Sequence, residues 1–257
     1  MTNQAVLEPI ATEVIQPPRS LVTAAGRAIG DFDMIRDGDR ILLGLSGGKD
    51  SLSLLHVLLH LQKKAPIKFE LAACTVDPQS DQFDPSPLKP YLAELGVKYF
   101  FDSQPIVAEA QKTLTKDTDS FCAYCSRMRR GILYRVAREN GYNVLALAQH
   151  LDDLAETLML SMFFGGKLRT MQAHYLNDAG DLRVIRPFVY VRERQTRAFA
   201  EAAGLPVIFE NCPACFAKPQ QRYAMKLMLA EQEKLHPKLF ASLLTAMKPQ
   251  MGKPPAG

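Results

Sequence analysis

Short runs of consecutive apolar residues alternate along the chain with segments in which apolar residues recur every three or four positions. The first pattern predicts buried strands and the second predicts amphipathic helices. We expect strands at residues 41–45, 69–76, 97–101, 144–148, 183–187 and 207–209. We expect helices at residues 21–35, 51–62, 88–95, 106–114, 122–140, 151–164 and 193–203, with further helices after residue 215. Parallel strands need crossover connections, which helices supply, so this order predicts an α/β fold with a doubly wound parallel sheet.

The two ends of the chain lack this periodicity and are rich in proline. We therefore expect a flexible N-terminal lead at residues 1–20 and a flexible tail at residues 249–257. Between them we expect an α/β domain at residues 21–215 and a helical C-terminal segment at residues 216–248. A chain of 257 residues is long enough for one large domain with a small appendage.

The composition is that of an ordinary globular protein, with 47% hydrophobic and 23% charged residues, which excludes bulk disorder and a fibrous repeat. The net charge of +4 suits an anionic partner without identifying one. The sequence has no apolar run of about 18 residues, and its first segment lacks a secretory signal pattern. We expect a cytoplasmic protein that does not span a membrane.

A glycine-containing hexapeptide lies between the first expected strand and the helix that follows it. It reads Ser46, Gly47, Gly48, Lys49, Asp50, Ser51. Glycines let the backbone approach a ligand closely, and the free N–H groups at a helix start favour anions, so the pattern predicts a phosphate site. Lys49 adds positive charge, and Asp50 is suited to closing the loop or binding Mg²⁺. An ordinary strand-to-helix turn is the alternative.

The hexapeptide is not a Walker A loop, because Leu43 stands where that motif needs glycine and Asp50 where it needs Ser or Thr. It resembles instead the PP-loop of the N-type ATP pyrophosphatases, which cleave ATP between its α and β phosphates. The resemblance implies that ATP and Mg²⁺ bind here and that a carbonyl or carboxyl oxygen is adenylated.

Further polar residues follow the expected strands. Asp77 ends the second strand, where it either contacts the nucleotide or forms an Asp-Pro turn. His150, Asp152 and Asp153 match a His-x-Asp-Asp element that lies near the nucleotide in PP-loop enzymes, and helix capping is the alternative for either aspartate. Gln149 stands where relatives commonly have a first histidine.

Four of the five cysteines form two Cys-x-x-Cys pairs, Cys122 with Cys125 and Cys212 with Cys215, and Cys74 is separate. In a reducing compartment this spacing favours metal binding or redox chemistry over structural disulfides. The cysteines alone leave three candidates open, namely a zinc site, an iron-sulfur cluster and a redox dithiol.

The hexapeptide, the segment 122–134 and the later Cys-Pro-Ala-Cys sequence together resemble the tRNA 2-thiocytidine synthetase family. The resemblance extends over most of the chain. It implies a [4Fe-4S] cluster held by Cys122, Cys125 and Cys215, with one iron left open for sulfur. Cys212 matches an auxiliary thiol, and a fourth ligand at that position would instead make the metal site structural.

The resemblance also implies the substrate and partners. These are tRNA, in which cytidine 32 is adenylated at C2 and thiolated, a sulfur donor of the cysteine desulfurase type, and a second copy of the chain in a homodimer. We expect Lys49, Asp50 and Asp153 to act in adenylation. Dense arginines suit RNA phosphates, although a salt-bridged helix face is the alternative. The RNA-binding candidates are Arg127, Arg129, Arg130 and Arg135.

Two other functions remain open at this stage. One is a PP-loop enzyme that modifies another tRNA position or another carbonyl substrate, with zinc in the cysteine site. The other is a non-catalytic module that binds a nucleotide through the loop and a metal through the cysteines. Metal analysis separates the first from the cluster enzyme, and conversion of ATP to AMP and pyrophosphate excludes the second.

Overall fold

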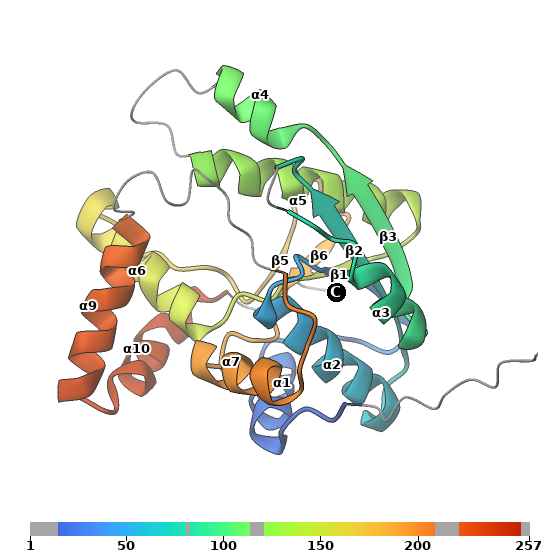
Figure 1. The fold of residues 1–257 in the computed structure, drawn as a ribbon. Helices are drawn as coiled ribbons and strands as arrows, with labels where there is room; N and C mark the ends of the chain where they lie inside the picture. Colours follow the sequence, from blue (N-terminus) through green and yellow to red (C-terminus); the bar gives the residue numbers. More distant parts are fainter. Residues whose placement is uncertain (1–14, 81–82, 114–120, 209–220, 253–257) are drawn as a thin grey trace, which may run out of the picture.

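The computed structural model describes residues 15–80, 83–113, 121–208 and 221–252 (Figure 1). Its centre is a six-stranded sheet with the order β3-β2-β1-β4-β6-β5. All neighbouring strands are parallel except β5, which runs antiparallel to β6. The strands are β1 (Asp39–Gly44), β2 (Phe69–Asp77), β3 (Lys98–Ser103), β4 (Val144–Ala146), β5 (His174–Leu176) and β6 (Arg183–Ile185).

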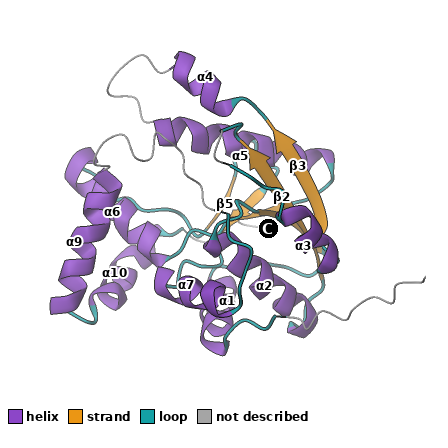
Figure 2. Ribbon diagram, in the orientation of Figure 1, coloured by secondary structure: helices purple, strands orange, loops and turns teal. Residues whose placement is uncertain are grey.

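Helices cover both faces of the sheet, as a doubly wound fold requires (Figure 2). On one side lie α1 (Arg19–Asp31), α2 (Lys49–Lys64) and α7 (Glu193–Ala202), and on the other lie α4 (Ile106–Thr113) and α5 (Phe121–Glu139). The remaining helices are α3 (Leu88–Glu94), α6 (Leu151–Gly165), α9 (Gln221–Leu235), α10 (Leu239–Met247) and the short 3₁₀ helix η1 (Lys248–Gln250). No helix in the described ranges is long and apolar enough to cross a membrane.

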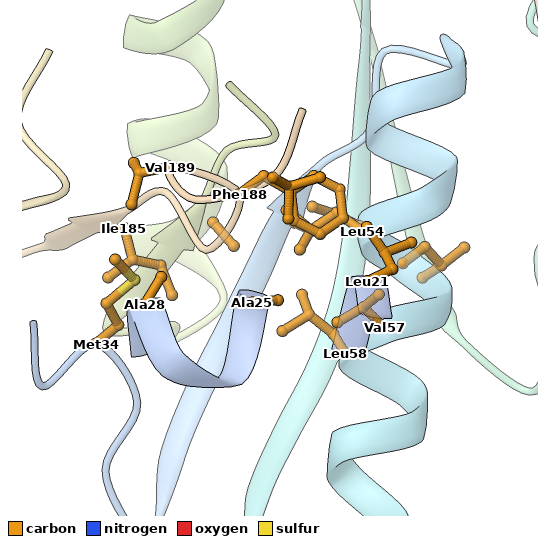
Figure 3. Packing of buried hydrophobic residues seen from close by; sticks show 14 of the residues in the cluster. Leu21, Ala25, Ala28, Met34, Leu54, Val57, Leu58, Ile185, Phe188 and Val189 are labelled. Carbon is orange, nitrogen blue, oxygen red and sulfur yellow. The ribbon is translucent and has the colours of Figure 1, made fainter. Parts of the chain in front are cut away.

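Alternation along the strands divides the core into two layers. Within β1, Ile41 and Leu43 face the larger cluster while Leu42 faces the smaller one beneath α5. The larger cluster continues through the apolar stripe of α1, where Leu21 and Ala25 lie against the helix α2 (Figure 3). Small alanines on α1 let the two helices approach closely, so α2 and the loop preceding it are held firmly against the sheet.

The strand order reverses between β1 and β4. From β1 the chain proceeds outward to β2 and β3, and from β4 it proceeds in the other direction to β6. At such a switch point the loops after the two central strands diverge, which leaves a crevice at the carboxyl edge of the sheet. The hexapeptide follows β1, and the His-x-Asp-Asp element follows β4, so both lie at this crevice.

Within the described residues, one strand was not predicted and one predicted strand was wrong. Residues 174–176 form the short strand β5, which three residues are too few to reveal by periodicity. Val207 and Ile208, predicted as a strand, pair with no sheet partner. Ile208 instead donates its N–H to the carbonyl oxygen of Gly47 at 2.9 Å, so this segment closes over the hexapeptide. Residue 209 lies outside the described residues.

The ends of the folded part differ from the expected lead and tail. Helix α1 begins at Arg19, and Pro17 before it is buried. At the other end Met251 is fully buried, and its carbonyl oxygen accepts a hydrogen bond from the N–H of Ala173. Residues 15–20 and 249–252 therefore belong to the folded structure, because their apolar side chains complete the larger core cluster.

Candidate active site

A cavity of about 650 Å³ opens at the carboxyl edge of the sheet, where β1, β2 and β4 end. The hexapeptide lines one part of this cavity, and α5, the start of α6 and the loop before β5 line other parts. Ser46, Gly48, Asp50 and Ser51 line it from the hexapeptide side. This volume suits a nucleotide-sized ligand.

The hexapeptide is held in a compact turn by its own hydroxyl groups. Ser51 Oγ donates to the carbonyl oxygen of Gly48 at 3.0 Å and lies 3.2 Å from Ser46 Oγ. Gly48 N–H donates to Ser46 Oγ at 3.3 Å. Helix α2 begins directly after Gly48, so its first N–H groups face the cavity end of the turn, which is the arrangement of an anion cradle.

Position 47 requires glycine for two reasons, its backbone conformation and the closeness of the Ile208 side chain. Its φ of +83° lies in the left-handed region. An added Cβ would lie 2.7 Å from Cδ1 of Ile208. The loop therefore has no room for a side chain at this position, and the Ile208 segment fixes it from above.

Lys49 is held by two carboxylates. Its Nζ lies 2.9 Å from Asp50 Oδ2 and 3.1 Å from Glu193 Oε1 at the start of α7. Burial opposes the charge on Lys49, but the two carboxylates outweigh it and raise its pKa. On Glu193 burial alone would raise the pKa, whereas Lys226 of α9 and Lys49 together lower it to about 2. Lys49 and Glu193 thus remain charged at neutral pH.

Asp50 and Asp153 both lie beside His150 at the carboxyl ends of the neighbouring strands β1 and β4. Asp50 accepts a hydrogen bond from Thr196 Oγ1 of α7, and its Oδ2 lies 3.8 Å from Nε2 of His150. His150 is the N-cap of α6: its Nδ1 accepts from the N–H of Asp153, whose Oδ2 accepts from the N–H of His150 at 3.0 Å. Both Asp50 and Asp153 line the cavity.

Two residues predicted to contact the nucleotide, Asp77 and Asp152, have other partners in the structure. Asp152 receives both the guanidinium of Arg192 and the N–H of Glu193, so its carboxylate fixes α7 against α6 outside the main cavity. Asp77 accepts from the N–H of Gln79 and from Ser103 Oγ, which makes it part of the turn that follows β2. The turn noted as the alternative for Asp77 describes its contacts. The helix-capping alternative describes Asp153, which caps α6 together with His150, whereas Asp152 pairs with α7.

A buried arginine, Arg186, also lines the cavity. Arg186 is only 5% exposed, and its Nε donates to Gln149 Oε1 at 2.9 Å. Its guanidinium lies 5.3 Å from the ring centre of Tyr175. Burial lowers the pKa of Arg186. Gln149 therefore serves as an uncharged acceptor for the arginine at the position where relatives commonly have histidine.

The four RNA-binding candidates on α5 occupy different environments. Arg129 and Arg130 line the cavity, whereas Arg127 is exposed beside it. Arg135 pairs with Asp102 of β3 at 2.5 Å and with Glu139 one helical turn later at 3.2 Å. Arg135 thus belongs to a salt-bridged surface, and Arg129 and Arg130 are the candidates that face the site.

Comparison with known proteins gives the family of this site. The PP-loop domain family matches residues 21–211. The tRNA-cytidine(32) 2-sulfurtransferase of Geobacter sulfurreducens is 43% identical over 232 residues, covering 89% of both chains. The enzyme of the same name from Vibrio cholerae is 43% identical and covers 87% of this chain and 71% of its own. The chain belongs to the tRNA-cytidine(32) 2-sulfurtransferase family of PP-loop proteins.

The fold agrees with that of a solved relative. The U34-tRNA thiolase NcsA from Methanococcus maripaludis, solved with its [4Fe-4S] cluster, superposes with a TM-score of 0.71 at 23% identity. The match covers 89% of this chain and 78% of NcsA. The prediction of a doubly wound α/β sheet is confirmed, and the family match to residues 21–211 confirms the prediction of a PP-loop domain.

The structure of this 2-sulfurtransferase family member places one of the four paired cysteines at the cavity. Cys125 on α5 lines the same cavity as the hexapeptide. The side chain of Cys122, and Cys212 and Cys215 entirely, lie outside the described residues. In the part of the chain that is described, no group of three or more His, Cys, Asp or Glu side chains is arranged to hold a metal ion. Burial raises the pKa of Cys74 to about 12, so this thiol stays protonated.

Sequence reasoning missed the residues of α7 that support this PP-loop. Glu193 and Thr196 contact Lys49 and Asp50 across more than a hundred residues of sequence, and Lys226 completes the network from α9. Acidic residues at a helix start are common, since they complement the helix dipole, so Glu193 carries no distinguishing local signal. Only the packing of α7 against α2 brings it to the lysine.

Proposed function

We infer that this protein is an ATP-dependent tRNA sulfurtransferase that converts cytidine 32 of tRNA to 2-thiocytidine. The observation that carries this proposal is that the PP-loop and Cys125 line one cavity in a chain that matches the curated 2-sulfurtransferase of Geobacter sulfurreducens over 89% of both lengths. One cavity that offers an anion cradle and a thiol suits a reaction that first activates a carbonyl oxygen and then replaces it with sulfur.

In the first step, the C2 oxygen of cytidine attacks the α-phosphorus of ATP, and pyrophosphate leaves. The N–H groups of Gly48 and the following residues, together with Lys49, stabilise the negative charge that develops on the leaving group. Asp50 and Asp153 are the carboxylates placed to hold Mg²⁺, a cation that takes few protein ligands and many phosphate oxygens. Their closeness to the PP-loop supports this assignment.

In the second step, hydrosulfide-level sulfur forms a bond to C2, the C2–O bond breaks, and AMP leaves with the former carbonyl oxygen. The sulfur loses its proton, so the product carries a C2 thiocarbonyl. Arg129, Arg130 and Arg186 surround the cavity and suit the phosphates that flank the reacting nucleoside.

We propose that Cys122, Cys125 and Cys215 hold a [4Fe-4S] cluster, with Cys212 as an auxiliary thiol or fourth ligand. Cys125 fits this role because it reaches the cavity in which sulfur is needed, and Cys122 lies one helical turn before it on α5. When bound with three cysteine ligands, such a cluster supplies an iron without a protein thiolate, to which sulfur can bind.

The proposal extends to partners and location. The sulfur comes from a donor of the cysteine desulfurase type, and two copies of the chain form a homodimer that works in the cytoplasm. Neither the donor nor the second copy is needed to explain the geometry of the cavity. Sedimentation of the purified protein and reconstitution with a desulfurase test these two points separately.

The central test is a nucleoside analysis of tRNA. A host that lacks 2-thiocytidine is given this gene, and its tRNA is digested and searched by mass spectrometry for every sulfur-bearing nucleoside. We expect 2-thiocytidine to appear only with the gene. If another thiolated base appears instead, the substrate position is different, and if no thiolated base appears, the proposed reaction is wrong.

Replacing Glu193 by Gln should lower stability in a pH-dependent way. The carboxylate is half-buried between Lys49 and Lys226. Removing its charge leaves Lys49 with Asp50 as its only recorded carboxylate partner among the described residues and takes the recorded partner from Lys226, at a cost of about 1–3 kcal/mol near neutral pH. Its pKa falls from the ordinary 4.5 to about 2 on folding, so the stabilisation exists above 4.5 and is lost as the pH falls toward 2.

Urea unfolding of wild type and E193Q at pH 7 and at pH 3 measures this effect. The difference in unfolding free energy should shrink at the lower pH. E201Q is the matched control, because Glu201 is an exposed carboxylate on the same helix. An equal difference at both pH values would mean that the loss comes from packing and not from the charge.

A further inference from the structure

The carboxyl end of α6 carries an exposed apolar surface that the proposed reaction does not use. We define the α6-end patch as Met162, Phe163, Phe164 and Leu168. Phe163 is 56% exposed, Phe164 58% and Leu168 66%. Three large apolar side chains exposed within six residues at one helix end indicate an interaction surface, since scattered exposed apolar residues are ordinary but clustered ones are not. This end of α6 lies at the outer edge of the molecule (Figure 1).

Hydrogen bonds fix the backbone at the end of α6 and in the segment that follows it. Gly166 adopts a left-handed conformation with φ of 59°, and the N–H of Lys167 donates to the carbonyl oxygen of Ser161 at 3.0 Å. This is a Schellman-type helix end, which turns the chain sharply back. Thr170 Oγ1 then donates to the carbonyl oxygen of Leu154 at 2.8 Å, so the segment returns along α6 toward its N-terminus.

The same segment connects the patch to the active-site cavity. Met171, three residues after Leu168, lines the cavity, and Asp153 lines it from the first turn of α6. Three extended residues span at most about 11 Å. Stacked nucleotides advance about 3.4 Å each, so this distance corresponds to roughly three nucleotides. Leu168 is therefore within about three nucleotides of a base that reacts in the cavity. Phe163 and Phe164 come ten and eleven residues after Asp153 on α6, about 15 to 17 Å along the helix axis, which corresponds to roughly four to five nucleotides.

The two charged residues in the segment directly after α6 are both positive. Lys167 and Arg169 are both exposed, and neither forms an ion pair with a carboxylate among the described residues. Aromatic rings followed closely by exposed cations suit single-stranded RNA, because bases stack on the rings while the cations meet the phosphates. A symmetric contact between two copies would instead bring like charges together, and lysine is depleted at protein interfaces.

We propose that the α6-end patch, with Lys167 and Arg169, binds the unpaired nucleotides of the tRNA anticodon loop next to cytidine 32. This inference rests on the proposed function, because position 32 lies in that loop. Bases beside the target stack on Phe163 and Phe164 while the target enters the cavity. The patch thereby recognises a single-stranded segment and holds it in register with the site.

The test measures binding of unmodified tRNA, and of its isolated anticodon stem-loop, to the full-length protein. F163A/F164A should bind both RNAs about 10- to 100-fold more weakly, with ATP binding unchanged. F163Y/F164Y retains the π faces and should bind like wild type, whereas F163L/F164L retains only apolar bulk and should remain weak. K167A/R169A should reduce the slope of log affinity against log salt by about 1 to 2.

F101A and K63A/K64A are the matched controls, since Phe101 on β3 is half exposed and the two lysines are exposed at the end of α2. Both should bind RNA like wild type. Unchanged RNA affinity in F163A/F164A overturns the inference. So does full rescue by leucine, or a fall in sedimentation mass without a change in RNA affinity, which would identify a contact between copies. Wild-type 2-thiocytidine formation is scored separately, so failure of the reaction is not confused with failure of the patch.

Discussion

Lys49→Ala should abolish formation of AMP and pyrophosphate while leaving the fold and the metal content intact. Lys49 is the cation of the PP-loop, and its ammonium lies between Asp50 and Glu193 at the edge of the anion cradle. Removing one preorganised electrostatic group from a charged transition state typically lowers the rate by about 100- to 1,000-fold. Glu193 retains Lys226 as a partner, so we expect no unpaired buried charge in the variant.

The measurement is single-turnover release of labelled pyrophosphate from ATP in the presence of substrate tRNA. Lys64→Ala is the matched control, because Lys64 belongs to the same helix but is exposed at its far end. Wild-type rates in the Lys49 variant would contradict the PP-loop assignment. If Lys49→Ala loses both pyrophosphate release and secondary structure, Lys49→Arg is measured in its place. Arginine retains the positive charge, so this variant should recover folding and part of the activity.

Cys125→Ser should remove the iron-sulfur cluster and with it all 2-thiocytidine formation, while ATP still binds. The thiolate is the iron ligand, and serine offers an alkoxide that binds iron poorly. Cys125 lines the cavity from α5 and is not part of the anion cradle, which the hexapeptide and the start of α2 form, so nucleotide binding should survive. We expect wild-type ATP affinity and no thiolation in this variant.

Protein purified without oxygen is analysed for iron, zinc and acid-labile sulfide, and its product is measured by nucleoside mass spectrometry. Cys74→Ala is the control, because this buried thiol stays protonated and should change neither result. Cys212→Ser tests the number of ligands: an intact cluster indicates three cysteine ligands, and its loss indicates four. Zinc in place of iron in the wild type, or full thiolation by Cys125→Ser, would end the cluster proposal.

The local features of this protein were readable from its sequence because each depends on neighbouring residues alone. Apolar periodicity gave β1, β2, α2 and α6 to within a few residues, and the glycines and lysine of the hexapeptide identified the PP-loop. The connection of parallel strands through helices then predicted the sheet. Strands of only a few residues contain too few repeats of the two-residue alternation to be recognised, and β5, with three residues and an antiparallel pairing, is the clearest example.

The predicted site residues have different partners in the structure, so only some of their side chains face the cavity. Asp153 reaches the cavity with Asp50, whereas its neighbour Asp152 turns to Arg192 on α7. Successive residues on a helix point about 100° apart, so adjacent aspartates serve different surfaces. The sequence places both at the edge of the sheet but does not say which one faces the nucleotide.

The sequence by itself determined that a phosphate-binding loop follows the first strand of a doubly wound sheet, and that two cysteine pairs accompany it. The tertiary structure decided which charges surround that loop. Glu193, Thr196 and Lys226 come to Lys49 and Asp50 only because α7 and α9 pack against α2 and α6. Ion pairs between distant segments depend on packing that buries apolar faces, and that packing leaves no local pattern at the charged residues themselves.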